Sequence, residues 1–169
     1  AELMAEATKY YANILNPFSP MVTRKIKEIL GMSLPLSMIC PSHGLIWRDH
    51  PEQIVEKYLE WADSYQEDQI VLVYDTMWNA TRRMAEAIAE GIGEAAPEAT
   101  VKLLNTSKID KTDVITEVFR SKAVVMGSPT VNNGYLYSVA GILELMRGAK
   151  LKKKKAAAFG SYGWSGESV

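Results

Sequence analysis

One stretch constrains the fold of this chain more than any other: in residues 71–81 an apolar run ends at a polar turn. Residues 71–74 are rich in β-branched and aromatic side chains, a pattern typical of a buried strand. The turn contains Thr76 and Thr81, and a helical pattern begins at Arg82. Backbone N–H groups at the start of a helix have no partner within the helix and attract an anion. The stretch therefore predicts a strand, a hydroxyl-lined turn and a helix, a layout that suits a phosphate.

A second interpretation of this turn is structural: a threonine caps a helix that has no further function. The turn is not glycine-rich, so it is neither a dinucleotide-binding fingerprint nor a Walker loop. Threonine hydroxyls stand where a Walker loop has lysine. If the turn binds a phosphate, this favours a cofactor phosphate that stays bound and is not transferred.

Strand and helix patterns alternate through the second part of the chain. Apolar runs predict strands at 70–74, 100–105, 123–127 and 156–159. Helical patterns lie between them at 81–94, 110–120 and 138–146. Asp110 is the expected N-cap of the second of these helices. Such alternation predicts an α/β fold, a doubly wound parallel sheet with helices on both faces. Ligands of these sheets bind at the carboxyl ends of the strands.

The first part of the chain follows another pattern. Residues 1–30 are helical with breaks at the prolines, 36–40 predict a short strand with a buried Cys40, and 51–65 predict an amphipathic helix. The polar stretch 66–68 is the expected junction. We therefore expect two domains, 1–66 and 67–169.

Composition excludes several classes of protein. The chain has 169 residues and a net charge of −1, without the basic excess of a nucleic-acid binder. One cysteine excludes an internal disulfide and favours a cytoplasmic location, and no apolar run approaches the ~20 residues of a membrane span. No signal peptide is recognisable at the N-terminus. Ala1 lies inside a helical pattern and Val169 follows a glycine-rich turn, so we expect a fragment or one chain of a divided protein.

Two further strands end in polar loops. After the strand at 123–127 come Ser128, Pro129, Thr130, Val131, Asn132, Asn133 and Gly134. This loop either presents amides and side chains to a flat heterocycle or is simply good turn chemistry, since Asn and Gly tolerate left-handed backbone geometry. After the strand at 156–159 come Ser161, Tyr162, Gly163, Trp164, Ser165 and Gly166. Its aromatic rings either stack on a planar ligand or close the edge of the domain.

Together the three loops describe a mononucleotide site, with one loop for the phosphate and two for the ring. Flavin mononucleotide (FMN) suits it better than a nicotinamide dinucleotide, because the Gly-x-Gly-x-x-Gly turn is missing.

Two other features have open interpretations. His43 follows the strand expected at 36–40 in a tight turn, where it is a metal ligand, a satisfied structural residue or an exposed one. No cluster of His, Asp and Glu with ligand spacing accompanies it. The basic run Lys152–Lys155 is either a solvated approach to a strand or a docking site for an acidic redox partner.

The motifs resemble those of one family. Tyr74–Trp78, Ser128–Gly134 and Phe159–Gly166 resemble, in order, the three flavin loops of the flavodiiron proteins, or A-type flavoproteins. Upstream, Tyr10–Leu15 and Pro41–Arg48 are similar to the closing segment of that family's metallo-β-lactamase-like αββα domain. The resemblance covers nearly the whole chain.

The resemblance implies a flavodoxin-like domain that binds FMN and a preceding domain with two iron ions. It implies that electrons from rubredoxin or a similar donor pass through FMN to the iron centre of a head-to-tail homodimer, which reduces dioxygen to water or nitric oxide to nitrous oxide. His43 matches the last histidine ligand of that centre. The residues implied to hold FMN are Thr76, Met77, Trp78, Asn79, Ala80 and Thr81 for the phosphate, and 128–134 and 161–166 for the ring.

The chain also departs from the family. The His-x-Glu-x-Asp-His run, the next histidine and the bridging aspartate of the iron site are absent, and so are the final strand and helix of the flavodoxin domain. Two alternatives therefore stand beside an oxygen or nitric oxide reductase. One is a flavodoxin-like electron carrier without reductase activity, and the other is a regulatory module without flavin. A His-x-Glu-x-Asp run ahead of Ala1 would favour the reductase.

Overall fold

The computed structural model describes residues 2–169, which divide into two compact units. One unit comprises residues up to Tyr65 together with Ala149–Leu151, and the other comprises Gln66–Gly148 and Lys152–Val169.

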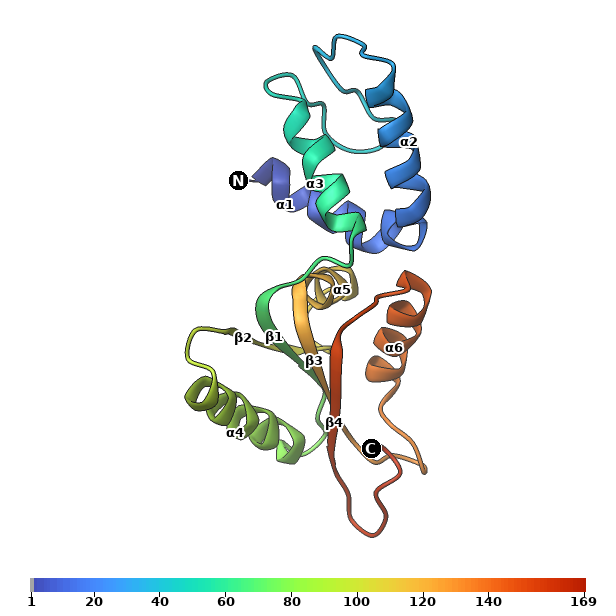
Figure 1. Cartoon of the computed structure of the whole chain (residues 1–169). Helices are drawn as coiled ribbons and strands as arrows, with labels where there is room; N and C mark the ends of the chain where they lie inside the picture. Colours follow the sequence, from blue (N-terminus) through green and yellow to red (C-terminus); the bar gives the residue numbers. More distant parts are fainter. Residues whose placement is uncertain (1) are drawn as a thin grey trace. The chain divides into compact units, whose positions relative to one another are not determined.

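A four-stranded parallel sheet forms the centre of the second unit (Figure 1). Its strands are β1 (Glu67–Tyr74), β2 (Thr100–Asn105), β3 (Ser121–Pro129) and β4 (Lys155–Ser161), in the order β2-β1-β3-β4. Residues 71–73 of β1 are fully buried, because helices cover both faces of a parallel sheet and leave its central strands no solvent-facing side. The sheet confirms the doubly wound α/β fold expected from the alternating pattern.

Three helices cover the sheet (Figure 1). On one face lies α4 (Ala80–Ala95), which packs against all four strands, and on the other lie α5 (Lys111–Arg120) and α6 (Tyr137–Ala149). A core cluster under α4 joins Ala85 to Tyr74 of β1 and Phe159 of β4. As predicted, the Asp110 side chain caps α5 by accepting a hydrogen bond from the Thr112 amide at 2.8 Å.

The first unit is built from helices: α1 (Glu2–Tyr10), a π-helical turn (Tyr11–Leu15), a 3₁₀ turn (Asn16–Phe18), α2 (Ser19–Gly31) and α3 (Glu52–Ala62). Its core includes an aromatic cluster in which Tyr11 lies 5.1 Å from Tyr58 and 5.4 Å from Trp61, measured between ring centroids. Burial raises the pKa of Tyr58 to about 12.

The strand predicted at 36–40 does not form. Ile39 and Trp47 make a single antiparallel bridge, with both backbone bonds at 2.9 Å, and the chain around them is irregular. A strand needs neighbours to pair with, and one bridge does not extend into a ladder. Cys40 is exposed, so the prediction of a buried strand cysteine was wrong.

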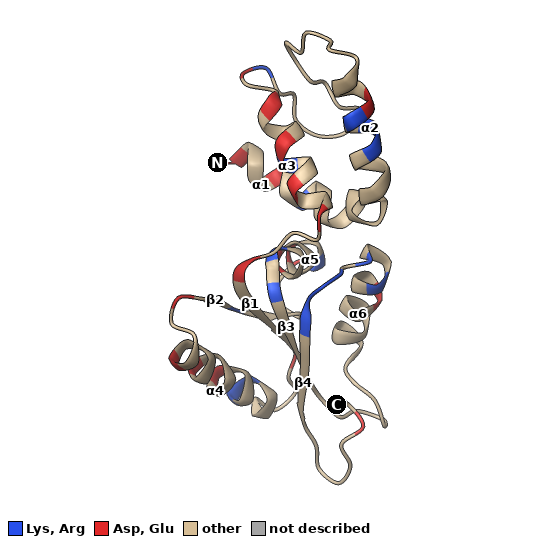
Figure 2. Ribbon diagram, in the orientation of Figure 1, with Lys and Arg blue, Asp and Glu red and all other residues tan. Residues whose placement is uncertain are grey.

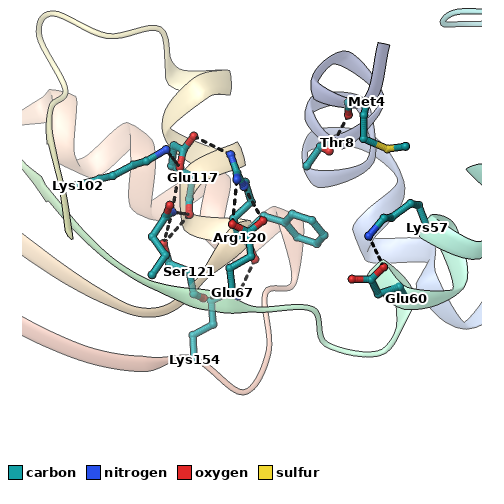
Figure 3. Close-up of polar contacts among 12 residues, drawn as sticks. Met4, Thr8, Lys57, Glu60, Glu67, Lys102, Glu117, Arg120, Ser121 and Lys154 are labelled. Atoms are coloured by element: carbon teal, nitrogen blue, oxygen red, sulfur yellow. Dashed lines mark hydrogen bonds and ion pairs between the residues drawn. The ribbon is translucent and has the colours of Figure 1, made fainter. Parts of the chain in front are cut away.

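A polar network closes the amino-terminal end of the sheet (Figure 3). The Gln69 amide donates to Oε2 of Glu117 and to Oγ of Ser121, both at 2.9 Å, and Arg120 forms a two-pronged pair with Glu67 at 2.7 and 2.9 Å. Gln69 and Ser121 are buried polar residues that need hydrogen-bond partners, and this network supplies them. The network ties α5 to β1 and β3 at the end of the sheet opposite to the three polar loops.

The basic run Lys152–Lys155 lies at the start of β4, at this same end of the sheet (Figure 2). Lys154 is half-buried and donates to the carbonyls of Phe119 and Ser121, at 2.8 and 2.7 Å. Its neighbours Lys152, Lys153 and Lys155 are exposed. One of the four lysines therefore caps the carboxyl end of α5 instead of facing solvent.

Within residues 2–169, no helix combines the length and the apolar character that a membrane span requires.

Candidate flavin site

Three strands of the second unit end at the same edge of the sheet. Tyr74 of β1 is in register with Gly127 of β3, which is in register with Phe159 of β4. The loops that follow these strands therefore meet at the carboxyl edge, toward the lower end of the sheet in Figure 1. None of 76–81, 130–136 and 161–166 contains a charged residue, and the ribbon is correspondingly tan there in Figure 2. An anion held at this edge would be bound by amides and hydroxyls.

The first loop leads into α4 through Asn79. This residue is the N-cap of α4, has a left-handed backbone with φ of 63°, and makes no side-chain cap hydrogen bond. The interpretation of the turn as a threonine cap was therefore wrong, since neither Thr76 nor Thr81 occupies the cap position. With no cap side chain bound to them, the first amides of α4 are suited to an anion.

The two threonines of this loop have different surroundings. Thr81 is fully buried, and its Oγ1 lies 2.9 Å from Oγ of Ser161 in the loop after β4. Oγ1 of Thr76 is buried and has no hydrogen-bond partner among the described residues. Since a buried hydroxyl without a partner costs about 1–3 kcal/mol, a phosphate oxygen would relieve an unfavourable feature of this loop.

The loop after β3 forms a tight turn. Val131 and Gly134 exchange two backbone hydrogen bonds of 2.9 Å, and between them Asn132 and Asn133 have left-handed backbones with φ of 48° and 61°. Asparagine adopts this geometry more readily than most residues. The amide of Thr130 donates to the carbonyl of Ser161 at 2.8 Å, which holds this loop beside the one after β4.

Large aromatic side chains of this edge face solvent. Trp78, Tyr162 and Trp164 are 88%, 66% and 93% exposed. Solvent-exposed indole and phenol rings of this size are typical of surfaces that stack on a ligand or a partner. The edge thus combines hydroxyls and free amides for an anion with rings for a planar group.

His43 lies in the first unit, in the irregular segment before α3. It is exposed, and its Nδ1 lies 3.1 Å from Oγ of Ser42, which leaves Nε2 available to a further ligand. It lines a cavity of about 340 Å³ together with Glu6, Tyr10 and Trp47. Among residues 2–169, no three or more His, Cys, Asp or Glu side chains gather as a metal site.

The fold and the edge loops define a class of protein. The sequence model of the flavodoxin family matches residues 72–168, and the chain belongs to this family. Flavodoxin domains bind FMN, and the residues present fit this cofactor: the unpartnered Thr76 hydroxyl and uncapped amides suit its phosphate, and the exposed aromatic rings suit its flavin.

Comparison over the whole chain is more specific and confirms the resemblance to flavodiiron proteins. Over 168 residues, 99% of this chain, it is 57% identical to the anaerobic nitric oxide reductase flavorubredoxin of Aeromonas salmonicida and 56% identical to that of Klebsiella pneumoniae. It covers 32% and 35% of these relatives, so it spans about a third of their length.

Solved structures of flavodiiron proteins are similar to this chain as well. The rubredoxin oxygen:oxidoreductase of Desulfovibrio gigas matches 95% of this chain with a TM-score of 0.88 at 39% identity, and 40% of that protein is covered. The flavodiiron protein of Giardia intestinalis matches 95% with a TM-score of 0.87 at 32% identity, over 39% of its length. These matches extend through both units of the chain.

Proposed function

We propose that residues 67–169 bind FMN at the carboxyl edge of the sheet. The observation that carries this proposal is the convergence of the three uncharged loops. The contact of Thr81 with Ser161 joins the first to the third, and the hydrogen bond from the Thr130 amide to the Ser161 carbonyl joins the second to the third. When bound, FMN supplies electron-transfer chemistry at its ring. The chain supplies binding, orientation and the exclusion of water.

The loops have different parts in this proposal. Residues 76–81 hold the phosphate, with the amides at the start of α4 and the hydroxyls of Thr76 and Thr81 as donors. Residues 128–134 and 161–166 hold the ring. The second of these loops contains the exposed aromatic side chains Tyr162 and Trp164, which can stack on it.

We further propose that residues 1–66 are the closing segment of a metallo-β-lactamase-like domain with two iron ions. His43 would give one neutral imidazole nitrogen to an iron. Its exposure and the cavity that it lines with Glu6 support this role. Residues 2–169 contain no group of three or more His, Cys, Asp or Glu side chains that could hold a metal ion. The other iron ligands would therefore come from outside these residues.

The function that these proposals support is delivery of electrons through FMN to a di-iron centre that reduces nitric oxide or dioxygen. Nitric oxide is the first choice, because the relatives at 55–57% identity are named nitric oxide reductases. The name of the Desulfovibrio gigas protein favours rubredoxin or a similar protein as electron donor. We also propose that the protein forms a head-to-tail homodimer and lies in the cytoplasm.

A second candidate is a flavodoxin-like electron carrier without reductase activity. The family match to residues 72–168 favours it, as does an archaeal flavodoxin that aligns with 59% of this chain at a TM-score of 0.51 and 29% identity. A carrier would need the FMN site and would have no use for His43.

Rapid mixing of the reduced intact protein with nitric oxide tests the two candidates. Nitric oxide is the better probe, because free reduced flavin also reacts with dioxygen. We expect fast reoxidation of the flavin absorbance in wild type and at least about ten-fold slower reoxidation in His43→Ala, with FMN content unchanged. His50→Ala removes the chain's other histidine, which is exposed and pairs with Glu52, and should behave as wild type. Equal rates in all three proteins would favour the carrier.

A further inference from the structure

Asp75, at the end of β1, holds an unusual position for a carboxylate. It is only 6% exposed, and it directly precedes the loop proposed for the phosphate. Its Oδ2 accepts hydrogen bonds from Oγ of Ser107 and Oγ of Ser138, both at 2.5 Å, and its Oδ1 accepts one from the amide of Thr76 at 2.8 Å. The carboxylate is therefore bonded on both oxygens.

The three donors come from separate parts of the second unit. Thr76 begins the first loop, Ser107 lies between β2 and α5, and Ser138 lies in the first turn of α6. The backbone of Asp75 adds a fourth connection, because its amide donates to the carbonyl of Gly127 in β3 at 3.1 Å. Asp75 thus joins the beginning of the first loop to the elements on either side of it.

A carboxylate in this position cannot be a phosphate ligand, since it carries the same sign of charge and has no hydrogen to donate. Burying it costs free energy that hydrogen bonds must offset. Bonds to a charged acceptor are stronger than neutral ones, so the three donors both stabilise the carboxylate and are held firmly by it. The contact by which Asp75 can support a phosphate site is its hydrogen bond from the backbone amide of Thr76.

We propose that Asp75 is a positioning residue that sets the phosphate loop in its binding geometry before the cofactor arrives. This inference rests on the proposed FMN site. A loop that is already ordered loses less conformational freedom when the phosphate binds. Asp75 therefore acts on affinity for the phosphate end of FMN and much less on affinity for the ring.

Two substitutions separate the shape of this side chain from its charge. Asp75→Ala removes all three side-chain bonds. In Asp75→Asn the amide oxygen still accepts from Thr76, and the amide nitrogen donates its two hydrogens to the hydroxyls of Ser107 and Ser138, which rotate to accept them. The asparagine variant should therefore preserve the loop. Glu98→Ala, which removes an exposed carboxylate of the same unit, is the matched control.

The test is fluorescence titration of the flavin-free intact protein with FMN and with riboflavin, which has the same ring and no phosphate. For Asp75→Ala we expect FMN affinity at least about ten-fold weaker and riboflavin affinity within about three-fold of wild type. Asp75→Asn and Glu98→Ala should bind both flavins within about three-fold of wild type. Circular dichroism checks that each variant is folded.

The outcomes are distinguishable. Equal weakening of FMN and riboflavin by Asp75→Ala, or no weakening of either, would overturn the positioning role. If Asp75→Ala does not fold, the Ser107→Ala, Ser138→Ala double variant takes its place, because it keeps the carboxylate and removes its two hydroxyl donors. FMN affinity at least about ten-fold weaker with riboflavin affinity retained would support the positioning role, and unchanged affinity for both flavins would overturn it. A wild-type protein that binds neither flavin would instead refute the proposed FMN site.

Discussion

Oγ1 of Thr81 and Oγ of Ser161 lie 2.9 Å apart, although 80 residues separate them in sequence. The contact joins the first turn of α4 to the end of β4, and Thr81 is fully buried there. Two of the three loops of the proposed flavin site thus contact each other directly. Their relative position is set by the folded unit itself.

Thr81→Val keeps the shape of the side chain and removes this contact together with one proposed phosphate donor. We expect FMN affinity to fall about ten-fold, because a lost hydrogen bond to a charged group costs about 1.5–3 kcal/mol. Titration with FMN measures the change, and Thr100→Val, an exposed threonine at the start of β2, is the control. Affinities of the two variants that agree within error would contradict the role given to Thr81.

Gly160 lies where the backbones of β3 and β4 meet near the site. A Cβ at this position would lie 2.4 Å from the carbonyl oxygen of Ser128, which is backbone and cannot move aside cheaply. Gly160→Ala should therefore lower the free energy of unfolding by about 1–3 kcal/mol.

Gly93 is the matched control for this substitution. It lies inside α4, and a Cβ there would meet no atom within 4 Å. Gly93→Ala should raise the free energy of unfolding by about 0.5–1 kcal/mol, since alanine is the better helix former. Urea unfolding of both variants compares the two effects, and the same sign of change in both would refute the packing argument.

The pH dependence of stability should depend on Lys154. Burial lowers the pKa of Lys154 from its ordinary value of 10.5 to about 8. Between about pH 8 and 10.5 the unfolded chain binds more protons at this residue than the folded chain, so its contribution to stability rises with pH. Below pH 8 both states are protonated and the contribution is constant.

Urea unfolding from pH 7 to pH 10 measures this effect. The stability of wild type relative to Lys154→Met should increase above pH 8. The same comparison with Lys152→Met, an exposed lysine of the same run, should stay flat. A flat difference between wild type and Lys154→Met would contradict the lowered pKa, and a wild-type advantage that falls with rising pH would show that the folded state favours the ammonium form.

Gln69 should be the costliest side chain to remove from the network at the amino end of the sheet. It is 2% exposed, and its amide donates to Glu117 and Ser121. Gln69→Leu leaves those acceptors without this donor and should cost about 1–3 kcal/mol in the free energy of unfolding. Gln66→Leu, at an exposed position, should change stability by less than about 0.5 kcal/mol. Equal costs would contradict the network.

Local rules predicted much of the fold. The strand 100–105 and the Asp110 cap follow from patterns within a few residues, and both occur as expected. The strand at 123–127 was predicted too short, because Ser121 is polar and yet fully buried. Its hydroxyl bonds to Gln69 and to the carbonyl of Glu117, contacts that only the folded sheet creates.

The candidate site was also predicted only in part from local patterns in the sequence. That three loops share one edge follows from the parallel direction of the strands, which the alternation of strands and helices predicts, and the structure brings the loops together as predicted. The hydrogen bonds of Asp75 were not predicted, because its partners Ser107 and Ser138 are 32 and 63 residues away. The one available signal was an acidic residue directly after a buried strand. The burial of Lys154 and its bonds to the end of α5 were likewise not predicted, because all four residues of the basic run are lysines.

The central claim is that the edge loops form an FMN site, and the most direct measurement is the amount of flavin bound per chain. The intact protein is reconstituted with excess FMN, freed of unbound cofactor, and assayed by absorbance after release of the flavin. We predict about one FMN per chain for wild type and a large loss for the Thr76→Ala, Thr81→Val double variant. A wild-type protein without bound flavin, or a double variant that retains it fully, would contradict the account.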